Sequence, residues 1–243
     1  MIDNERFLSA AAEAKSAIDN GIGTYGEKLL HRTLKFYFEP DKSNHEVSCY
    51  GSVADIKNQD GITEIQTKSF VKLIPKLEKF LPEEKVRVIY PVIENKLISR
   101  VDTETGECLP PRKSPRKGRI SDALSEISMI RRFIPHPNLE IVVLTVDIIE
   151  TRMLKGKIRV GRKKTEKIDA IPMAINFVLT LSNPEDYRAL LPKGLPSEFT
   201  SSEFERISKL KNVSAHGALS LFLQLGILSR ERKGREAYKY RIN

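Results

Sequence analysis

Apolar side chains recur at helical spacing near the start of the chain. Phe7 and Ala11 belong to an apolar face that predicts a helix over residues 4–19. A second amphipathic pattern lies between Thr24, which can cap the start of a helix, and Pro40, which would stop it. The chain therefore begins with two helices.

Runs rich in β-branched residues then predict strands. Five candidate strands lie at residues 45–50, 53–57, 62–68, 86–90 and 96–101, the last two separated by a turn at Asn95. Helical spacing is found over residues 71–81, where Pro75 could bend the helix. After the first helix, the expected order of elements is α-β-β-β-α-β.

The middle of the chain is harder to interpret. Residues 102–119 combine Thr-Gly, Pro-Pro and a dense basic run, which predicts a loop. A helix over 121–133 and a buried strand over 139–146 should follow. The apolar segment 168–181 fits neither helix nor strand clearly.

The pattern changes near residues 181–184, or alternatively at residues 192–196, where Pro and Gly accumulate. A short helix after Thr200, a longer helix capped by Ser214 and a hairpin over 227–242 are expected. This order resembles a winged helix. We therefore predict an α/β domain over 1–182 and a small winged helix-turn-helix domain over 183–243.

Composition narrows the class of protein. Lys and Arg outnumber Asp and Glu by 41 to 32, giving a formal net charge of +9 and a pI of about 9.4, which suits a nucleic-acid partner. Cys49 and Cys108 are too few for a disulfide framework and lack a CxxC spacing for zinc, which indicates a reducing compartment. No apolar run approaches the roughly 20 residues of a membrane helix. We expect a cytoplasmic protein without a membrane partner.

Several other chemistries lack their motifs. The chain contains no GxxxxGK[ST] or GxGxxG loop for nucleotides and no GxSxG nucleophile elbow. The histidines have no paired metal-ligand spacing, so structural or surface roles are expected for His31, His45, His136 and His216.

Polar residues occupy a strand that should be apolar. In an extended segment, Glu64, Gln66 and Lys68 share one face. Asp55 lies on the preceding strand, and a tight turn would pair the two strands as a hairpin. The two carboxylates then meet, and Mg²⁺ or Mn²⁺ prefers such oxygen ligands. The alternative is that these residues lie on a solvated strand face.

These residues and the order of elements over 21–93 resemble the PD-(D/E)XK nuclease superfamily. That resemblance implies a restriction-endonuclease-like fold, with a mixed central sheet flanked by helices. It also implies that Asp55, Glu64 and the carbonyl group of Ile65 bind the metal ion. The runs EIQTKSF and RKSPRKG are also similar to an uncharacterised bacterial nuclease-like family.

The match to the superfamily pattern has one departure. Gln66 stands where most members have lysine, as in some restriction enzymes of the superfamily, and Lys68 on the same face could substitute for it. Many members also carry a Glu on the preceding helix, and Glu27 fits that position. An acidic residue in a first helical turn is also favoured by the helix dipole without any function.

Basic segments are candidates for contacts with a phosphate backbone. Each could equally be a solvated surface. The predicted nucleic-acid contacts in the first domain are Arg112, Lys113, Arg116, Lys117, Arg119, Arg162, Lys163 and Lys164. Those in the winged helix are Ser214, His216, Arg230, Arg232, Lys233 and Arg235.

The sequence therefore predicts a metal-dependent endonuclease that hydrolyses DNA phosphodiester bonds. Two alternatives stay open: an RNA-processing nuclease, and a non-catalytic DNA-binding or regulatory protein on a degenerate nuclease fold. A homodimer is also open, because nucleases that cut both strands of a duplex are often dimers.

Overall fold

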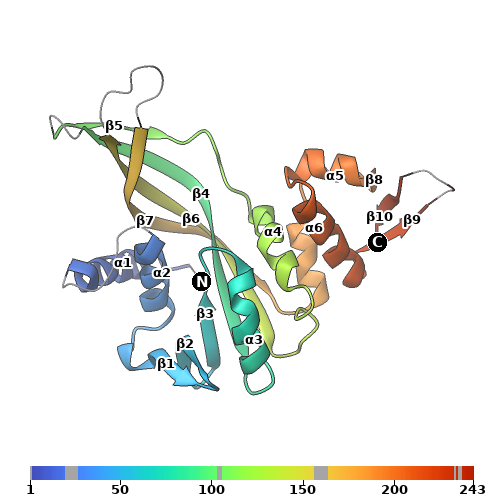
Figure 1. Cartoon of the computed structure of the whole chain (residues 1–243), viewed down its shortest axis with the longest axis horizontal. Helices are drawn as coiled ribbons and strands as arrows, with labels where there is room; N and C mark the ends of the chain where they lie inside the picture. Colours follow the sequence, from blue (N-terminus) through green and yellow to red (C-terminus); the bar gives the residue numbers. More distant parts are fainter. Residues whose placement is uncertain (1, 20–26, 103–105, 156–163, 233, 235–236) are drawn as a thin grey trace.

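Residues 2–19, 27–102, 106–155, 164–232, 234 and 237–243 are described by the computed structural model of the chain (Figure 1). The α-helices are α1 (Asn4–Asp19), α2 (Glu27–Phe38), α3 (Ile74–Phe80), α4 (Leu124–Ile127), α5 (Ser201–Ser208) and α6 (Val213–Gln224). The 3-10 helices are η1 (Lys42–Asn44), η2 (Phe70–Leu73), η3 (Ile120–Ala123), η4 (Ser128–Ile130) and η5 (Pro184–Leu190). The strands are β1 (His45–Cys49), β2 (Ser52–Asn58), β3 (Gly61–Ile65), β4 (Val86–Asp102), β5 (Cys108–Lys113), β6 (Leu139–Lys155), β7 (Lys164–Leu181), β8 (Glu198–Thr200), β9 (Leu228–Glu231) and β10 (Lys239–Ile242).

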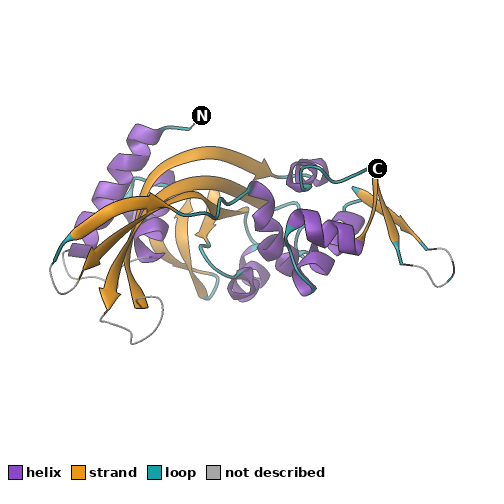
Figure 2. Ribbon diagram, turned by 90° about the horizontal axis from the view of Figure 1, so that it is seen from above, coloured by secondary structure: helices purple, strands orange, loops and turns teal. Residues whose placement is uncertain are grey.

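A large mixed sheet forms the centre of the molecule. Its strand order is β1-β2-β3-β4-β6-β7, with β5 paired to β4. The strands β1, β2 and β3 form an antiparallel meander, β3, β4 and β6 run parallel, and β7 returns antiparallel to β6. The long strands β4, β6 and β7 curve strongly (Figure 2). The protein is therefore a mixed α/β fold with a curled central sheet.

Helices cover both faces of this sheet (Figure 1). On one face, Leu34 of α2 belongs to the same buried cluster as Ile65 of β3. On the other face, Leu77 of α3 and Ile127 of α4 share a cluster with Val88 of β4. The strands β2 and β3 therefore lie between α2 and α3, and both helices can direct polar side chains toward them.

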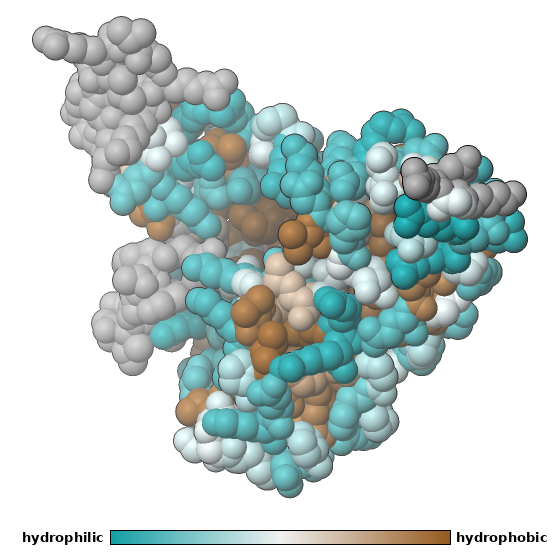
Figure 3. All heavy atoms as spheres, turned by 45° about the vertical axis from the view of Figure 1, so that its right-hand side comes forward, coloured by the Kyte–Doolittle hydropathy of each residue, from teal (hydrophilic) through white to brown (hydrophobic). Residues whose placement is uncertain are grey.

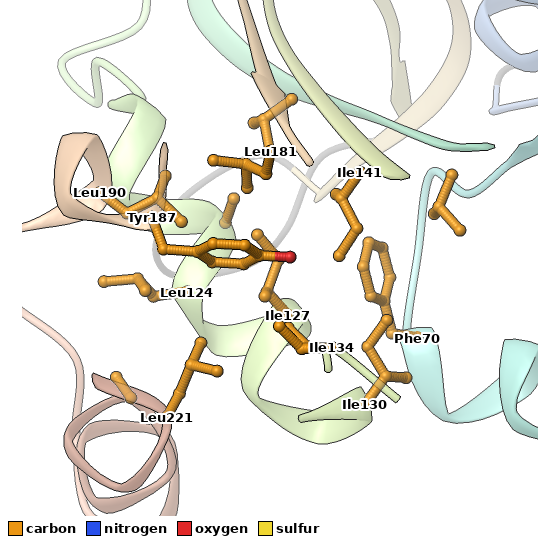
Figure 4. Packing of buried hydrophobic residues seen from close by; sticks show 14 of the residues in the cluster. Phe70, Leu124, Ile127, Ile130, Ile134, Ile141, Leu181, Tyr187, Leu190 and Leu221 are labelled. Atoms are coloured by element: carbon orange, nitrogen blue, oxygen red, sulfur yellow. The ribbon is translucent and has the colours of Figure 1, made fainter. Parts of the chain in front are cut away.

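The C-terminal segment packs onto the face that carries α4. Helices α5 and α6 are accompanied by a three-stranded sheet in the order β8-β10-β9. Tyr187, Leu190 and Leu221 lie around Leu124 and Ile127 in one apolar cluster (Figure 4). The apolar interior therefore continues from the large sheet into the C-terminal segment.

Most of the predicted elements are confirmed. The helices α1, α2, α5 and α6, the strands β1 to β3 and the hairpin of β9 and β10 occur where the patterns place them. Two of their bounds differ from the prediction: β3 ends at Ile65, and α6 is capped at Asn212 rather than at Ser214. The helix expected over 71–81 begins as η2, and Pro75 lies in the first turn of α3, where its missing N–H costs no hydrogen bond. The helix expected over 121–133 is divided into η3, α4 and η4.

The prediction of two strands separated by a turn at Asn95 is wrong. Residues 86–102 form the single strand β4, which is paired along its length with β6. A register shift occurs between Ile93 and Asn95, and the Asn95 amide donates to Oδ1 of Asp147 at 3.1 Å. The strand therefore absorbs its turn-forming residue as a bulge.

Two further strands lie where the sequence did not predict them. The expected loop over 102–119 contains β5, an exposed edge strand in which Pro110 and Pro111 are tolerated. The unassigned segment 168–181 lies in β7, which is also at an edge of the sheet, so Pro172 is acceptable there. In the part of the chain that the structure describes, no helix is long and apolar enough to cross a membrane.

Candidate functional site

Two carboxylates lie between β2 and β3, at the point where the strands stop pairing with each other. The ladder of paired residues ends at Ile56 and Thr63. Beyond it, the Asp55 amide donates to Oε1 of Glu64 at 3.3 Å, and the Ile65 amide donates to Oδ2 of Asp55 at 2.8 Å. Each side chain thus takes the place of a strand-to-strand hydrogen bond, which satisfies buried amides and holds both carboxylates in the gap.

Helices on both faces add a nitrogen group to this pair. Nζ of Lys76, in α3, lies 3.0 Å and 2.7 Å from the two carboxylate oxygens of Glu64. Nε2 of His31, in α2, lies 3.2 Å from Oδ2 of Asp55. We call these four residues the carboxylate cluster. Only 2% of Glu64 is exposed to solvent, so its charge depends strongly on its neighbours.

The two carboxylates differ in acidity. Burial, and then the charge of Asp55, raises the pKa of Glu64 to about 7, although Lys76 opposes this shift. Burial also acts to raise the pKa of Asp55, but the hydrogen bond and electrostatic attraction of His31, the Ile65 amide and Lys76 hold it below its ordinary value. Near neutral pH, Asp55 is therefore ionised while Glu64 lies close to its midpoint of protonation.

Glu64→Gln is expected to make stability less dependent on pH. A folded-state pKa raised from 4.5 to about 7 gives stability that is complete below about pH 4.5 and is lost as the pH rises through about 7. Glutamine does not titrate, so the variant does not lose this stability as the pH rises. The unfolding free energy of Glu64→Gln minus that of wild type should therefore increase from about pH 5 to pH 8, by up to roughly 3 kcal/mol. Chemical denaturation at both pH values measures this change. A constant difference between the proteins would contradict the raised pKa, and Glu185→Gln, at an exposed ion pair, is the control.

Two of the predicted site residues, Gln66 and Lys68, do not join the cluster as expected. The strand β3 ends at Ile65, so Gln66 and Lys68 do not extend its polar face. Nε2 of Gln66 donates to the Ser69 carbonyl oxygen at 3.1 Å, and Lys68 lies exposed in the following segment. Glu27 is the first residue of α2, but its side chain lies outside the described residues.

Two residues of the cluster were missed by the sequence analysis. His31 was predicted to be structural or on the surface, yet it contacts Asp55 from one turn beyond Glu27. Lys76 was not singled out, although its place on the helix after β3 offered a signal. Both contacts depend on how α2 and α3 pack against the sheet.

The donor set is compatible with a hard divalent cation. Among the described residues, no three His, Cys, Asp or Glu side chains are close enough to hold a metal ion by themselves. Mg²⁺ commonly uses one or two carboxylates and completes its shell with water and phosphate oxygens. Asp55 and Glu64 supply two carboxylates, and in the described part of the chain Oδ1 of Asp55 accepts no hydrogen bond.

The basic segment after β4 divides into residues with different surroundings. Arg112 and Lys113 are exposed on β5. Lys117 pairs with Glu94 at 3.1 Å, and Arg116 is exposed. Arg119 has a structural contact, because its Nη2 donates to the Ser208 carbonyl oxygen at 2.6 Å and so joins this segment to the end of α5. Arg162 and Lys163 lie outside the described residues, as does the side chain of Lys164.

The basic residues of the C-terminal hairpin surround one aromatic ring. The guanidinium groups of Arg230 and Arg232 lie 4.6 Å and 5.3 Å from the centre of the Tyr238 ring. His216 is exposed on α6, and Ser214 lies in its first turn. Lys233 and Arg235 are outside the described residues. Figure 3 shows a hollow, rimmed mainly by hydrophilic side chains, between the end of the long strands and the C-terminal segment.

In structural terms, the chain is a mixed α/β protein. Its curled sheet has helices on both faces and holds two buried carboxylates. The chain belongs to a family described as "Domain of unknown function (DUF8091)", whose model matches residues 28–182. All four residues of the carboxylate cluster lie within that match. The chain is also similar to an uncharacterised protein of Treponema pallidum (strain Nichols), with 33% identity over 168 residues. That alignment covers 69% of this chain and 64% of the relative, so the chain spans less than two thirds of the relative's length. No solved structure matches the chain significantly.

Proposed function

We propose that the protein is a metal-dependent endonuclease that hydrolyses DNA phosphodiester bonds, on a restriction-endonuclease-like fold. The observation that carries this proposal is the pair of buried carboxylates, Asp55 and Glu64, at the point where β2 and β3 separate. A solvated strand face does not explain them, because both side chains are buried and each accepts a backbone amide of the neighbouring strand.

Each residue of the carboxylate cluster has a role in this proposal. Asp55 and Glu64 would hold Mg²⁺ or Mn²⁺, with the carbonyl group of Ile65 as a further ligand, and the ion would supply charge stabilisation and a more acidic bound water. Lys76 carries a positive charge beside Glu64 and would stabilise the negative charge that develops on the phosphate. His31 orients the Asp55 carboxylate through its hydrogen bond.

The C-terminal segment would bind DNA as a winged helix. Its order of α5, α6 and the hairpin of β9 and β10 agrees with that interpretation. In this proposal Ser214 and His216 face a groove, while Arg230 and Arg232 lie beside the phosphate backbone. RNA is an alternative substrate that the same charge pattern would attract.

One observation favours the non-catalytic alternative. Nζ of Lys76 already lies within hydrogen-bond distance of both carboxylate oxygens of Glu64. An ion pair of this kind neutralises the buried charge without a metal ion, as a degenerate nuclease fold would require. Salt-dependent DNA affinity without cleavage would be the expected behaviour of such a protein.

A cleavage assay tests the proposed activity. The full chain is incubated with supercoiled plasmid, linear duplex, branched DNA and single-stranded RNA, in Mg²⁺, in Mn²⁺ and in EDTA. The expected result is metal-dependent cutting of at least one DNA substrate and none in EDTA. If only RNA is cleaved, RNA and not DNA is the substrate. An absence of cutting on every substrate would overturn the enzymatic proposal.

Lys76→Met is expected to slow cleavage on the order of 10²-fold, because it removes a fixed positive charge beside the reacting phosphate while keeping an unbranched side chain that is only one atom shorter. Single-turnover rates measure the effect. Lys72→Met, at an exposed lysine of η2, is the matched control and should retain wild-type activity. A large loss in Lys68→Met with none in Lys76→Met would return the role to Lys68.

A further inference from the structure

Just beyond the end of β3, the described strands leave one edge of β4 without a paired strand. The last bond between the two segments runs from the Gln66 amide to the Ile89 carbonyl oxygen at 2.9 Å. From there to Leu97, where β5 joins, no strand among the described residues pairs with this edge of β4. Such an open edge leaves room for a ligand beside the strand.

Residues 114–119, which we call the basic loop, cross this edge. The Ser114 amide donates to the Lys96 carbonyl oxygen at 2.8 Å, and the Gly118 amide donates to the Glu94 carbonyl oxygen at 3.0 Å. A Cβ atom on Gly118 would lie only 2.2 Å from the Ile93 carbonyl oxygen. The loop is therefore seated so closely that glycine is required, and its position relative to β4 is fixed.

A pocket of about 750 Å³ lies at the opposite ends of these strands, but a smaller pocket of about 330 Å³ lies under the basic loop. We call the smaller one the β4-edge pocket. Its lining comes from the segment after β3, from β4, from the basic loop and from η3 and α4. The polar members of this lining are Thr67, Tyr90, Lys96, Ser114, Arg116, Asp122 and Ser125.

The groups available in this pocket are mainly hydrogen-bond donors. The Asp122 carboxylate is occupied by Arg119, whose amide and Nη2 lie 3.2 Å and 3.4 Å from its oxygens. Nζ of Lys96 donates to Glu150 at 2.9 Å. In the described part of the chain, neither the Arg116 guanidinium nor the Tyr90 hydroxyl has a hydrogen-bond partner. An unpaired guanidinium with neighbouring hydroxyl groups matches the oxygens of a phosphate.

The Tyr90 hydroxyl has a fixed position and a fixed protonation state. Its ring packs edge-on against Phe70, with centroids 5.1 Å apart. Burial, and then Glu126 and Asp122, raises the pKa of Tyr90 to about 12, so the hydroxyl remains a donor at neutral pH. The neutral Tyr90 hydroxyl can therefore donate a hydrogen bond to an anion and has no negative charge that would repel it.

Only a short length of chain separates the β4-edge pocket from the carboxylate cluster. Thr67, in its lining, is three residues from Glu64, a span of at most about 10 Å. This corresponds to about three stacked nucleotides at 3.4 Å each. We propose that the β4-edge pocket binds a backbone phosphate of the nucleic-acid strand, near the phosphate that is cut, through Arg116 and Tyr90. This inference rests on the proposed function and assigns part of its substrate contact.

Affinity measured without cleavage tests the inference. Fluorescence anisotropy of a labelled DNA oligonucleotide is followed in EDTA, over a range of salt concentrations, for wild type, Arg116→Gln and Tyr90→Phe. Arg116→Gln should weaken binding about tenfold and reduce the slope of log affinity against log salt by about one. Tyr90→Phe should weaken binding several-fold with the slope unchanged, because only a neutral hydrogen bond is lost.

Arg87→Gln is the matched control, since Arg87 lies at the start of β4 and pairs with Glu140. It removes the same charge and should leave affinity nearly unchanged. Equal weakening by Arg116→Gln and Arg87→Gln would overturn the inference. The inference would also be overturned if inorganic phosphate bound through Arg116 but Arg116→Gln left oligonucleotide affinity unchanged. Arg116-dependent affinity in a protein that never cuts would overturn only the enzymatic proposal, whereas cutting without Arg116-dependent affinity would overturn only the pocket assignment.

Discussion

Asp55→Asn and Glu64→Gln are each expected to slow DNA cleavage on the order of 10³-fold. Each substitution removes one of the two carboxylate charges that would hold the metal ion. A 10³-fold loss in rate corresponds to about 4 kcal/mol of lost charge stabilisation, because about 1.4 kcal/mol changes the rate tenfold. Both replacements keep an oxygen that can accept the amide of the neighbouring strand, from Ile65 at Asp55 and from Asp55 at Glu64. The fold should therefore be retained while activity is lost.

Rates under single-turnover conditions, in saturating Mg²⁺, measure this loss, and circular dichroism checks the fold. Glu185→Gln, which removes a carboxylate from an exposed ion pair with Arg188, is the matched control and should cut at the wild-type rate. Wild-type activity in both Asp55→Asn and Glu64→Gln would show that the reaction takes place elsewhere on the chain.

Phe222→Ala is expected to destabilise the whole chain by about 3–5 kcal/mol, the usual cost of emptying a large buried site. Phe222, in α6, is fully buried and belongs to the apolar cluster that extends to Val88 of the central sheet. Because that cluster is continuous, the wild-type chain should unfold in a single transition, and Phe222→Ala should shift that entire transition.

Calorimetry and urea unfolding, followed by signals from both parts of the chain, check this prediction. Val213→Ala, in the same helix at a side chain that is 86% exposed, should change stability by less than about 0.5 kcal/mol. Two separate transitions, of which only one responds to Phe222→Ala, would instead indicate two independently folding domains.

The local part of the candidate site could be predicted from the sequence. The strands β2 and β3 are joined by a tight turn, so the facing positions of Asp55 and Glu64 follow from strand alternation and from the register that a short hairpin sets. The end of β3 could not be predicted in this way. Gln66 and Lys68 continue the alternating pattern, but after Ile65 the chain leaves the sheet and turns into η2, which begins at Phe70.

The remaining contacts of the cluster depend on tertiary packing. His31 and Lys76 reach the carboxylates from helices on opposite faces of the sheet, 24 and 12 residues away in the chain. The spacing of residues within one element cannot predict these contacts, because the contacts depend on how α2 and α3 pack on the sheet. The same reason explains β4, where pairing with β6 and a side-chain contact from Asp147 override the turn preference of Asn95.

A crystal structure of the protein soaked in Mn²⁺, with anomalous diffraction measured for the metal, shows directly whether Asp55 and Glu64 bind a cation. We expect an anomalous peak about 2.0–2.2 Å from carboxylate oxygens of both Asp55 and Glu64, with no such peak in Glu64→Gln. If the density there stays featureless at saturating Mn²⁺, with Lys76 still paired to Glu64, the carboxylates serve the fold alone and the proposed cleavage site is contradicted.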